Sequence, residues 1–183
     1  MNLVINEDNL RNSEVQEFST KVRAILVDED NQILISNYGN IILLPGGKVD
    51  KDESIFDAIT RELKEELGVY YKSDELELFE ILSYYQKNYP KVDGTIQNRL
   101  VKTYYFIGPY KGIKKELQKL SDREKKANFK LELVSLDELE NIILSNKNSN
   151  PRNIYFQKEL LFILSSYNNN IKKKLENKIS NFF

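Results

Sequence analysis

The chain has 183 residues, with 27 Lys and Arg against 28 Asp and Glu, and it contains neither His nor Cys. Its length and its 40% hydrophobic and 30% charged residues predict one globular domain with a real core. The missing His and Cys exclude Ser-His-Asp and Cys-His catalysis, Cys/His zinc sites and disulfides. A net charge of −1 argues against a dedicated nucleic-acid-binding protein.

Export and membrane insertion are not indicated by the sequence. Residues 1–8 lack the basic region and the apolar stretch of a secretory signal. The longest strongly apolar run, Leu160–Leu164, is far too short to span a bilayer. We therefore expect a cytoplasmic protein with no membrane partner.

The first third of the chain predicts strands. Residues 1–20 are polar and weakly patterned, and they predict a short helix or strap. Apolar residues that alternate over 21–27 and resume at 33–35, on either side of an Asp/Asn turn, predict a β-hairpin. A short buried strand is expected at 41–44, where Pro45-Gly46-Gly47 ends it.

A helix is predicted over residues 53–67, because its apolar residues recur at helical spacing. These residues are Ile55, Phe56, Ile59, Leu63 and Leu67. Gly68 stands where a left-handed residue commonly ends a helix, and Val69 supplies the apolar residue that follows.

The remainder of the chain predicts strands and then helices. Strands are expected at 76–85, 100–107 and 129–134, with a turn around 90–94 and a solvated charged loop at 111–126. Ser135–Glu138 has the capping-box pattern that opens a helix, and Asn150-Pro151 resembles the start of another. The elements together predict a single mixed α/β domain.

Three carboxylates share one side of the predicted helix. Glu62, Glu65 and Glu66 stand at i, i+3 and i+4, within roughly 100° of arc. Like charges at this spacing destabilise a helix by about 0.2–0.5 kcal/mol per pair, so the cluster favours a counter-ion. Oxygen ligands without His or Cys favour Mg²⁺, Mn²⁺ or Ca²⁺ over zinc. Arg61 can orient a carboxylate such as Glu53 through a fork-shaped ion pair.

The loop before the helix fits the same chemistry. Pro45 stiffens its entry, and Gly46-Gly47 permit close approaches that a Cβ would block. The carbonyl of Gly47 can therefore approach a metal held by the helix. A turn that leads into a helix N-terminus also offers N–H groups to an anion such as phosphate.

The segment Gly47–Val69 resembles the Nudix box. It has Gly47, five residues, Glu53, seven residues and then the run Arg61–Val69, and the preceding Leu44-Pro45-Gly46-Gly47 is also typical of that family. The resemblance implies a single Nudix hydrolase domain over residues 1–183. Its fold would be the α/β/α sandwich with a mixed β-sheet over about 20–145, with a C-terminal helical extension over about 150–183.

The resemblance also implies an activity. Members of this family hydrolyse a nucleoside diphosphate linked to another moiety, using Mg²⁺ or Mn²⁺, and water attacks a diphosphate phosphorus. The metal ligands would be Gly47, Glu62, Glu65 and Glu66. Glu62 and Glu65 would also count among the catalytic residues, together with Arg61, which would support the helix and loop beside Glu53.

With no His in the chain, the general base has to be a carboxylate or a metal-bound hydroxide. In many relatives a Glu after the box joins the site. Glu124, in the charged loop, is the first candidate, and Glu132 is the second.

Substrate recognition is only weakly indicated. The candidate residues for binding the nucleotide are Tyr38, Tyr84, Tyr85, Tyr104 and Arg99. Tyr84 and Tyr85 lie near the offset that marks dinucleoside polyphosphate hydrolases in the family, whereas the Pro that marks ADP-ribose hydrolases is missing. The absent Cys and His exclude the isopentenyl diphosphate isomerases of the same fold. Oxidised purine triphosphates, dinucleoside polyphosphates, ADP-ribose and nucleotide sugars stay open as substrates.

A second function is a catalytically silent Nudix-fold protein that binds a nucleotide in a regulatory role. Such proteins commonly lose part of the Arg-Glu-x-x-Glu-Glu motif, which is complete here at 61–66. The enzyme is therefore the favoured interpretation. A homodimer is also expected, because the family often dimerises and residues 1–20 have no other explanation.

Overall fold

A mixed β-sheet forms the centre of the molecule in the computed structural model, which describes residues 2–146 and 150–180, the last part (169–180) as helix backbone alone. The described residues form seven strands, in the sheet order β1-β5-β6-β2-β3-β4, with β7 paired to β3. Their bounds are β1 Asn2–Ile5, β2 Glu17–Val27, β3 Ile33–Tyr38, β4 Ile41–Leu43, β5 Glu77–Pro90, β6 Ile96–Pro109 and β7 Lys130–Val134.

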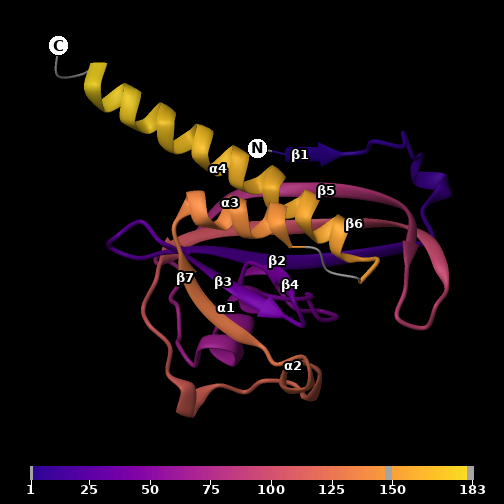
Figure 1. Ribbon diagram of the computed structural model, residues 1–183, viewed down its shortest axis with the longest axis horizontal. Helices are drawn as coiled ribbons and strands as arrows, with labels where there is room; N and C mark the ends of the chain where they lie inside the picture. Colours follow the sequence, from indigo (N-terminus) through magenta and orange to yellow (C-terminus); the bar gives the residue numbers. More distant parts are fainter. Residues whose placement is uncertain (1, 147–149, 181–183) are drawn as a thin grey trace.

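Helices cover both faces of this sheet. They are α1 Ile55–Leu67, α2 Asp122–Lys126, α3 Leu136–Ser145 and α4 Asn153–Ser180, with single 3₁₀ turns at Asn12–Glu14 and Lys115–Leu117. Helix α1 lies on one side of the sheet, whereas α3 and α4 lie on the other, above the strands in the view of Figure 1. The three layers confirm the predicted α/β/α arrangement with a mixed sheet and an added C-terminal helix.

The alternation of side chains along β2 separates two cores. Val22, Ala24 and Leu26 are fully buried on the side of α1, in one cluster with Leu63. Ile25 points to the other face and packs in a second cluster that also contains Leu160, Ile163 and Leu164 of α4. A central strand buried on both faces therefore joins the helix that carries the acidic residues to the C-terminal helix.

Local signals define α1 closely. The Ser54 hydroxyl accepts a hydrogen bond from the Asp57 N–H at 3.1 Å and caps the helix, which ends at Gly68 with φ +71°. A Cβ at Gly68 would lie 2.3 Å from the carbonyl oxygen of Lys114. The helix predicted over 53–67 is confirmed, and it begins two residues later than predicted.

The predicted hairpin is present, but its ladder is shorter than expected. Strands β2 and β3 exist as predicted, but they pair only at Val27 and Ile33. On its other edge, β2 pairs along its whole length with β6 in parallel, from Glu17–Arg99 to Val27–Pro109. The ladder with β3 is short because the loop after β4 occupies the rest of that edge, where the N–H groups of Val22 and Ala24 donate to the carbonyls of Gly47 and Pro45.

Several other predicted elements differ from the structure in their type or in their first residue. Residues 1–20 supply β1, which pairs with β5 in parallel, a single 3₁₀ turn and the start of β2, in place of a helix or strap. The charged segment 111–126 contains the short helix α2, and α4 begins at Asn153 and not at Asn150-Pro151. No helix within 2–146 and 150–180 is both long enough and apolar enough to cross a membrane.

Candidate functional site

A cleft of about 510 Å³ lies between α1, α2, the strands β2–β4 and the start of α4. It gathers six of the residues that the sequence indicated for the site: Tyr38, Gly47, Glu62, Glu65, Glu66 and Glu124. Residues up to 86 positions apart, Tyr38 and Glu124, thus meet in one cavity that is large enough for a small molecule.

The Pro45-Gly46-Gly47 loop is fixed to β2 by main-chain and guanidinium hydrogen bonds. The N–H groups of Ala24 and Val22 donate to the carbonyls of Pro45 (2.9 Å) and Gly47 (3.0 Å). The Arg23 guanidinium donates to the carbonyls of Leu44 (2.8 Å) and Gly46. These bonds hold the loop at one edge of the cleft.

Glu66 is the most buried acid of the cleft, with 4% of its surface exposed. Its Oε2 accepts a hydrogen bond from the N–H of Gly46 at 2.9 Å, which connects α1 to the loop. Burial raises the pKa of Glu66 to about 8, and the nearby carboxylates of Glu62 and Glu124 act in the same direction, against Arg23. A buried carboxylate beside like charges is a position that favours a bound cation.

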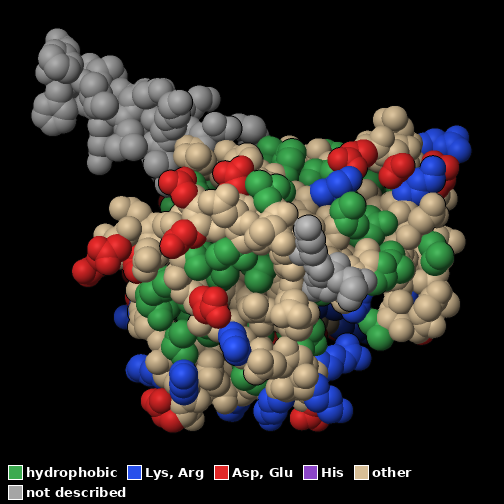
Figure 2. All heavy atoms as spheres, in the orientation of Figure 1, with side chains coloured by type: hydrophobic (Ala, Val, Ile, Leu, Met, Phe, Trp, Pro, Cys, Tyr) green, Lys and Arg blue, Asp and Glu red, His purple; other side chains and the backbone are tan. Residues whose placement is uncertain are grey.

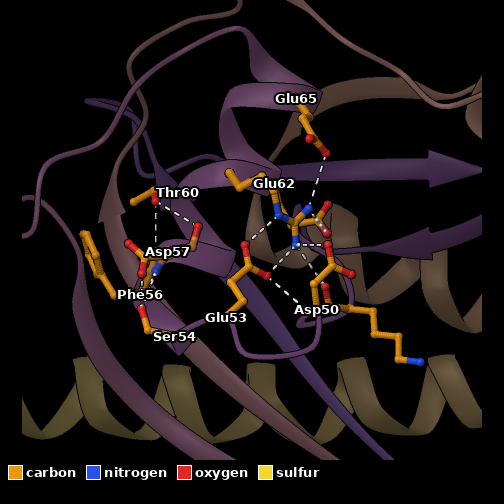
Figure 3. Close-up of polar contacts among 10 residues, drawn as sticks. Asp50, Glu53, Ser54, Phe56, Asp57, Thr60, Glu62 and Glu65 are labelled. Atoms are coloured by element: carbon orange, nitrogen blue, oxygen red, sulfur yellow. Dashed lines mark hydrogen bonds and ion pairs between the residues drawn. The ribbon is translucent and has the colours of Figure 1, made fainter.

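Arg61 joins the other acids of α1 to the loop that precedes the helix. Its guanidinium bonds both oxygens of Glu53, at 2.7 and 2.9 Å, and reaches Glu62 at 2.9 Å and Glu65 at 3.4 Å. Figure 3 shows the carboxylates of Asp50, Glu53 and Glu65 directed toward this one guanidinium. The bond to Arg61 lowers the pKa of Glu53, whereas burial raises the pKa of Glu62. The predicted pairing of Arg61 with Glu53 is therefore present.

Gly47 is required by the closeness of the loop to α1. A Cβ at this position would lie 2.3 Å from the carboxylate oxygen Oε1 of Glu62. The absence of a side chain thus lets the main chain of the loop approach the acidic side of the helix.

The donor chemistry fits Mg²⁺ or Mn²⁺, because the cleft offers carboxylate and carbonyl oxygens and no nitrogen or sulfur ligand. Among the described residues, however, no three acidic side chains are already gathered as a metal site. Glu66 is bonded to Gly46, and Glu62 and Glu65 are bonded to Arg61. Each of these bonds uses one of the two carboxylate oxygens, so the second oxygen of each group can still accept a cation.

The two candidates for the general base are placed differently. Glu124 lies in α2 and lines the cleft, and its carboxylate accepts a hydrogen bond from the N–H of Ser121 at 2.5 Å. Glu132 is exposed on β7, where it pairs with Ile35, and it does not line the cleft. The geometry favours Glu124 over Glu132.

Four of the five predicted nucleotide-binding residues lie outside the lining of the cleft: Tyr84, Tyr85, Arg99 and Tyr104. Tyr84 is 3% exposed in the core beside Tyr155, and the Tyr85 hydroxyl donates to Asn12 at 2.8 Å. Arg99 is buried, lies 3.2 Å from the ring centroid of Tyr89 and donates to Gln86. The sheet order accounts for Tyr84 and Tyr85, because β5 is separated from β2 by β6. Arg99 and Tyr104 are on β6 itself, but Arg99 pairs with Glu17 at the start of β2, and Tyr104 packs on the α1 side of the sheet. We therefore leave Tyr84, Tyr85, Tyr104 and Arg99 out of the candidate site.

The sequence analysis missed the basic and aromatic part of the cleft. This lining consists of Lys21, Arg23, Lys48, Arg123, Phe129, Arg152 and Phe156. The alternation along β2 places Lys21, Arg23 and Ile25 on one face of the sheet. This two-residue period could have predicted from the sequence that Lys21 and Arg23 lie together. Figure 2 shows further Lys and Arg side chains gathered over the end of the molecule where α2 lies. Acidic and basic groups thus share one cavity.

A sandwich of this order, in which a Gly-Gly loop faces an acidic helix, defines the Nudix class of domain. The family model of the NUDIX domain matches residues 18–157, and the chain belongs to this family. The predicted Nudix fold is thereby confirmed.

Two solved structures illustrate the relationship. The chain is 25% identical to the MutT protein of Bacillus halodurans, over 76% of this chain and 80% of that one, with a TM-score of 0.50. A NUDIX hydrolase from Nitrosomonas europaea shares the fold, with 18% identity over 79% and 88% of the two chains and a TM-score of 0.51. No match was found among curated proteins.

Proposed function

We propose that the protein is a metal-dependent Nudix pyrophosphohydrolase, in which water attacks a phosphorus of a nucleoside diphosphate linked to another moiety. The observation that carries this proposal is the cleft itself. It combines the acids Glu62, Glu65 and Glu66 on one helix with the Gly47 loop and with basic side chains. Acids suit a divalent cation, and bases suit the phosphates of a nucleotide.

The residues of the cleft have separate roles in this proposal. Glu62, Glu65, Glu66 and the carbonyl of Gly47 would hold Mg²⁺ or Mn²⁺, which when bound neutralises phosphate charge and lowers the pKa of a water molecule. Arg61 orients the carboxylates around it, and Glu124 accepts the proton of the attacking water.

The proposed partner is a small-molecule nucleotide, with Tyr38 available in the cleft for contact with the base. A cytoplasmic location, the absence of nucleic-acid and membrane partners, and homodimerisation belong to the same proposal. Sedimentation of the purified protein tests the dimer directly.

The variant Glu66→Gln tests the activity. Phosphate released from a panel of nucleotides would be measured with Mg²⁺ and with Mn²⁺, using a phosphatase to convert the products. We expect Glu66→Gln to lower the rate by at least about 100-fold, because it removes a buried metal-ligand charge. The matched control is Glu140→Gln, which changes an exposed acid of α3. Circular dichroism should show all three proteins folded.

Three results contradict the proposal: hydrolysis that survives in Glu66→Gln, hydrolysis that does not depend on metal, and silence of the wild type across the panel. Tight nucleotide binding by a silent wild type would instead identify a binding or regulatory protein.

A further inference from the structure

Lys21 is a basic residue of the cleft that lies outside the Nudix box. It belongs to β2, and the alternation of the strand puts it on the same face as Arg23 and Ile25, which is the face that α4 covers. In the sheet register Lys21 stands beside Thr103 of β6, and Arg23 stands beside Tyr105.

Helix α4 contacts Lys21 through the side chain of Phe156. The ring of Phe156 lies 5.3 Å from the Lys21 Nζ, within the range of a cation–π contact. One turn further along, Glu159 is 7% exposed and accepts hydrogen bonds from Thr103 (2.9 Å) and Tyr105 (2.7 Å). Glu159 is thereby fixed next to the two strand positions that neighbour Lys21 and Arg23.

The side chains of Lys21 and Arg23 differ in their bonding partners. Arg23 donates to the carbonyls of the loop, as described above. Lys21 has no ion pair within the part of the chain that the structure describes, although its side chain lines the cleft. Desolvation lowers its pKa to about 8, so it is still mainly protonated at pH 7. An ammonium group in this position is suited to an anionic ligand.

We propose that Lys21, positioned by Phe156 and Glu159 of α4, binds a phosphate group of the substrate across the cleft from the acids of α1. The proposal rests on the proposed function for the identity of the ligand as a nucleotide. It gives α4, which lies beyond the Nudix box, a direct part in substrate binding.

The test measures the binding of inorganic pyrophosphate by calorimetry at pH 7 in a metal-free buffer. We expect Lys21→Met to weaken the affinity at least about tenfold, and Lys21→Arg to stay within about threefold, because it keeps the charge. Lys158→Met is the matched control, because Lys158 is an exposed lysine of α4 paired with Glu7. It should bind like the wild type.

A second set of variants tests the positioning role of Phe156. Phe156→Leu should raise the KM for the hydrolysed nucleotide about fivefold or more with kcat little changed, and Phe156→Tyr should restore the KM. Phe162→Leu, on a part of α4 outside the cleft, should leave both constants unchanged.

The outcomes separate this proposal from the proposed function. Equal affinity of Lys21→Met and the wild type, or no pyrophosphate binding by the wild type, overturns the role of Lys21 even if nucleotides are hydrolysed. Binding that depends on Lys21 in a protein that hydrolyses no nucleotide supports the role of Lys21 and overturns the enzyme.

Discussion

Gly46 and Gly47 are neighbours in the loop, but substitutions at the two positions should act differently. A Cβ at Gly46 would lie 2.3 Å from the main-chain oxygen of Val22, and its φ of +126° disfavours any other residue. The three atoms nearest to a Cβ at Gly47 all belong to the carboxylate of Glu62, at the end of a flexible side chain.

We therefore expect Gly46→Ala to lower the free energy of unfolding by about 3 kcal/mol or more. Gly47→Ala should cost about 1 kcal/mol or less but remove most hydrolysis, because it displaces Glu62. Urea unfolding and phosphate release measure the two effects. A Gly47→Ala variant with full activity would show that the loop need not lie close to Glu62.

Lys21 should lower the stability of the protein at neutral pH. Its pKa falls from an ordinary 10.5 to about 8 in the folded protein, so between these values the unfolded chain holds a proton that the native state has released. The cost of burying the charged ammonium group is therefore absent above pH 10.5 and fully present below about pH 8. The free energy of unfolding falls as the pH is lowered between these two values.

The variant Lys21→Met should accordingly be more stable than the wild type at pH 7, by roughly 1–3 kcal/mol. The difference should shrink as the pH rises from about 8 to 10.5. Urea unfolding across this range measures it, with Lys158→Met as the control. A constant difference, or a less stable variant, would contradict the assigned environment of Lys21.

The acids and the basic residues of the cleft differ in how far the sequence could predict them. Glu62, Glu65 and Glu66 lie within five residues of one helix, so the helical period alone places them together. Lys21 and Phe156 come from β2 and α4, and their meeting depends on how α4 packs on the sheet. Tyr84 has suitable chemistry but lies on β5, which β6 separates from β2. Arg99 lies on β6 beside Glu17, four residues before Lys21.

At the scale of elements, α4 is attached to the sheet by polar as well as apolar contacts. Leu160, Ile163 and Leu164 enter the core, and Glu159 supplies the buried acceptor for Thr103 and Tyr105. The charge of Glu159 also favours the protonated form of Lys21. Removing the charge of Glu159 should weaken its hydrogen bonds to Thr103 and Tyr105 and also its attraction to the ammonium group of Lys21.

We expect Glu159→Gln to lower the free energy of unfolding by about 1–2 kcal/mol, since the hydrogen bonds to a charged acceptor become bonds to a neutral one. Lys158→Gln, which changes an exposed ion pair, should cost about 0.5 kcal/mol or less. Denaturant unfolding compares the two variants. Equal stabilities would mean that Glu159 does not contribute to the docking of α4.

Elements with local signals were predicted well. Helix α1 has its cap at Ser54 and its stop at Gly68, and α3 has the predicted capping box between Ser135 and Glu138. The parallel pairing of β2 with β6 could not be predicted, because apolar alternation specifies a strand and not its partner. The role of residues 1–20 was missed for the same reason, since β1 depends on the edge of β5.

At the scale of the whole molecule, a bound cation should stabilise the fold. A ligand at 100 times its dissociation constant contributes about 2.7 kcal/mol, which for a domain of this size is about 5–10 °C in Tm. We expect Mn²⁺ or Mg²⁺ to raise the Tm by this amount and EDTA to reverse it. Glu66→Gln should lose most of the shift, whereas Glu140→Gln should keep it. A full shift in Glu66→Gln would place the cation elsewhere.

The division of the chain into a core and a C-terminal extension stays a prediction, although the structure makes the two interdependent. Residues of α4 line the cleft and enter the same core as Ile25 of β2. A chain that ends before α4 should therefore lack one wall of its binding site.

The parallel pairing of β2 and β6 has a consequence for the order in which the chain folds during synthesis. Glu17 pairs with Arg99 and Val27 with Pro109, so every pair in this ladder joins residues 82 positions apart. Such long-range pairing slows folding, because a long loop must close before the contacts form. On the ribosome, β2 emerges with a single short contact to β3 available, and it waits for about eighty more residues before its full partner strand exists. The sheet can therefore complete itself only when more than half of the protein has been made.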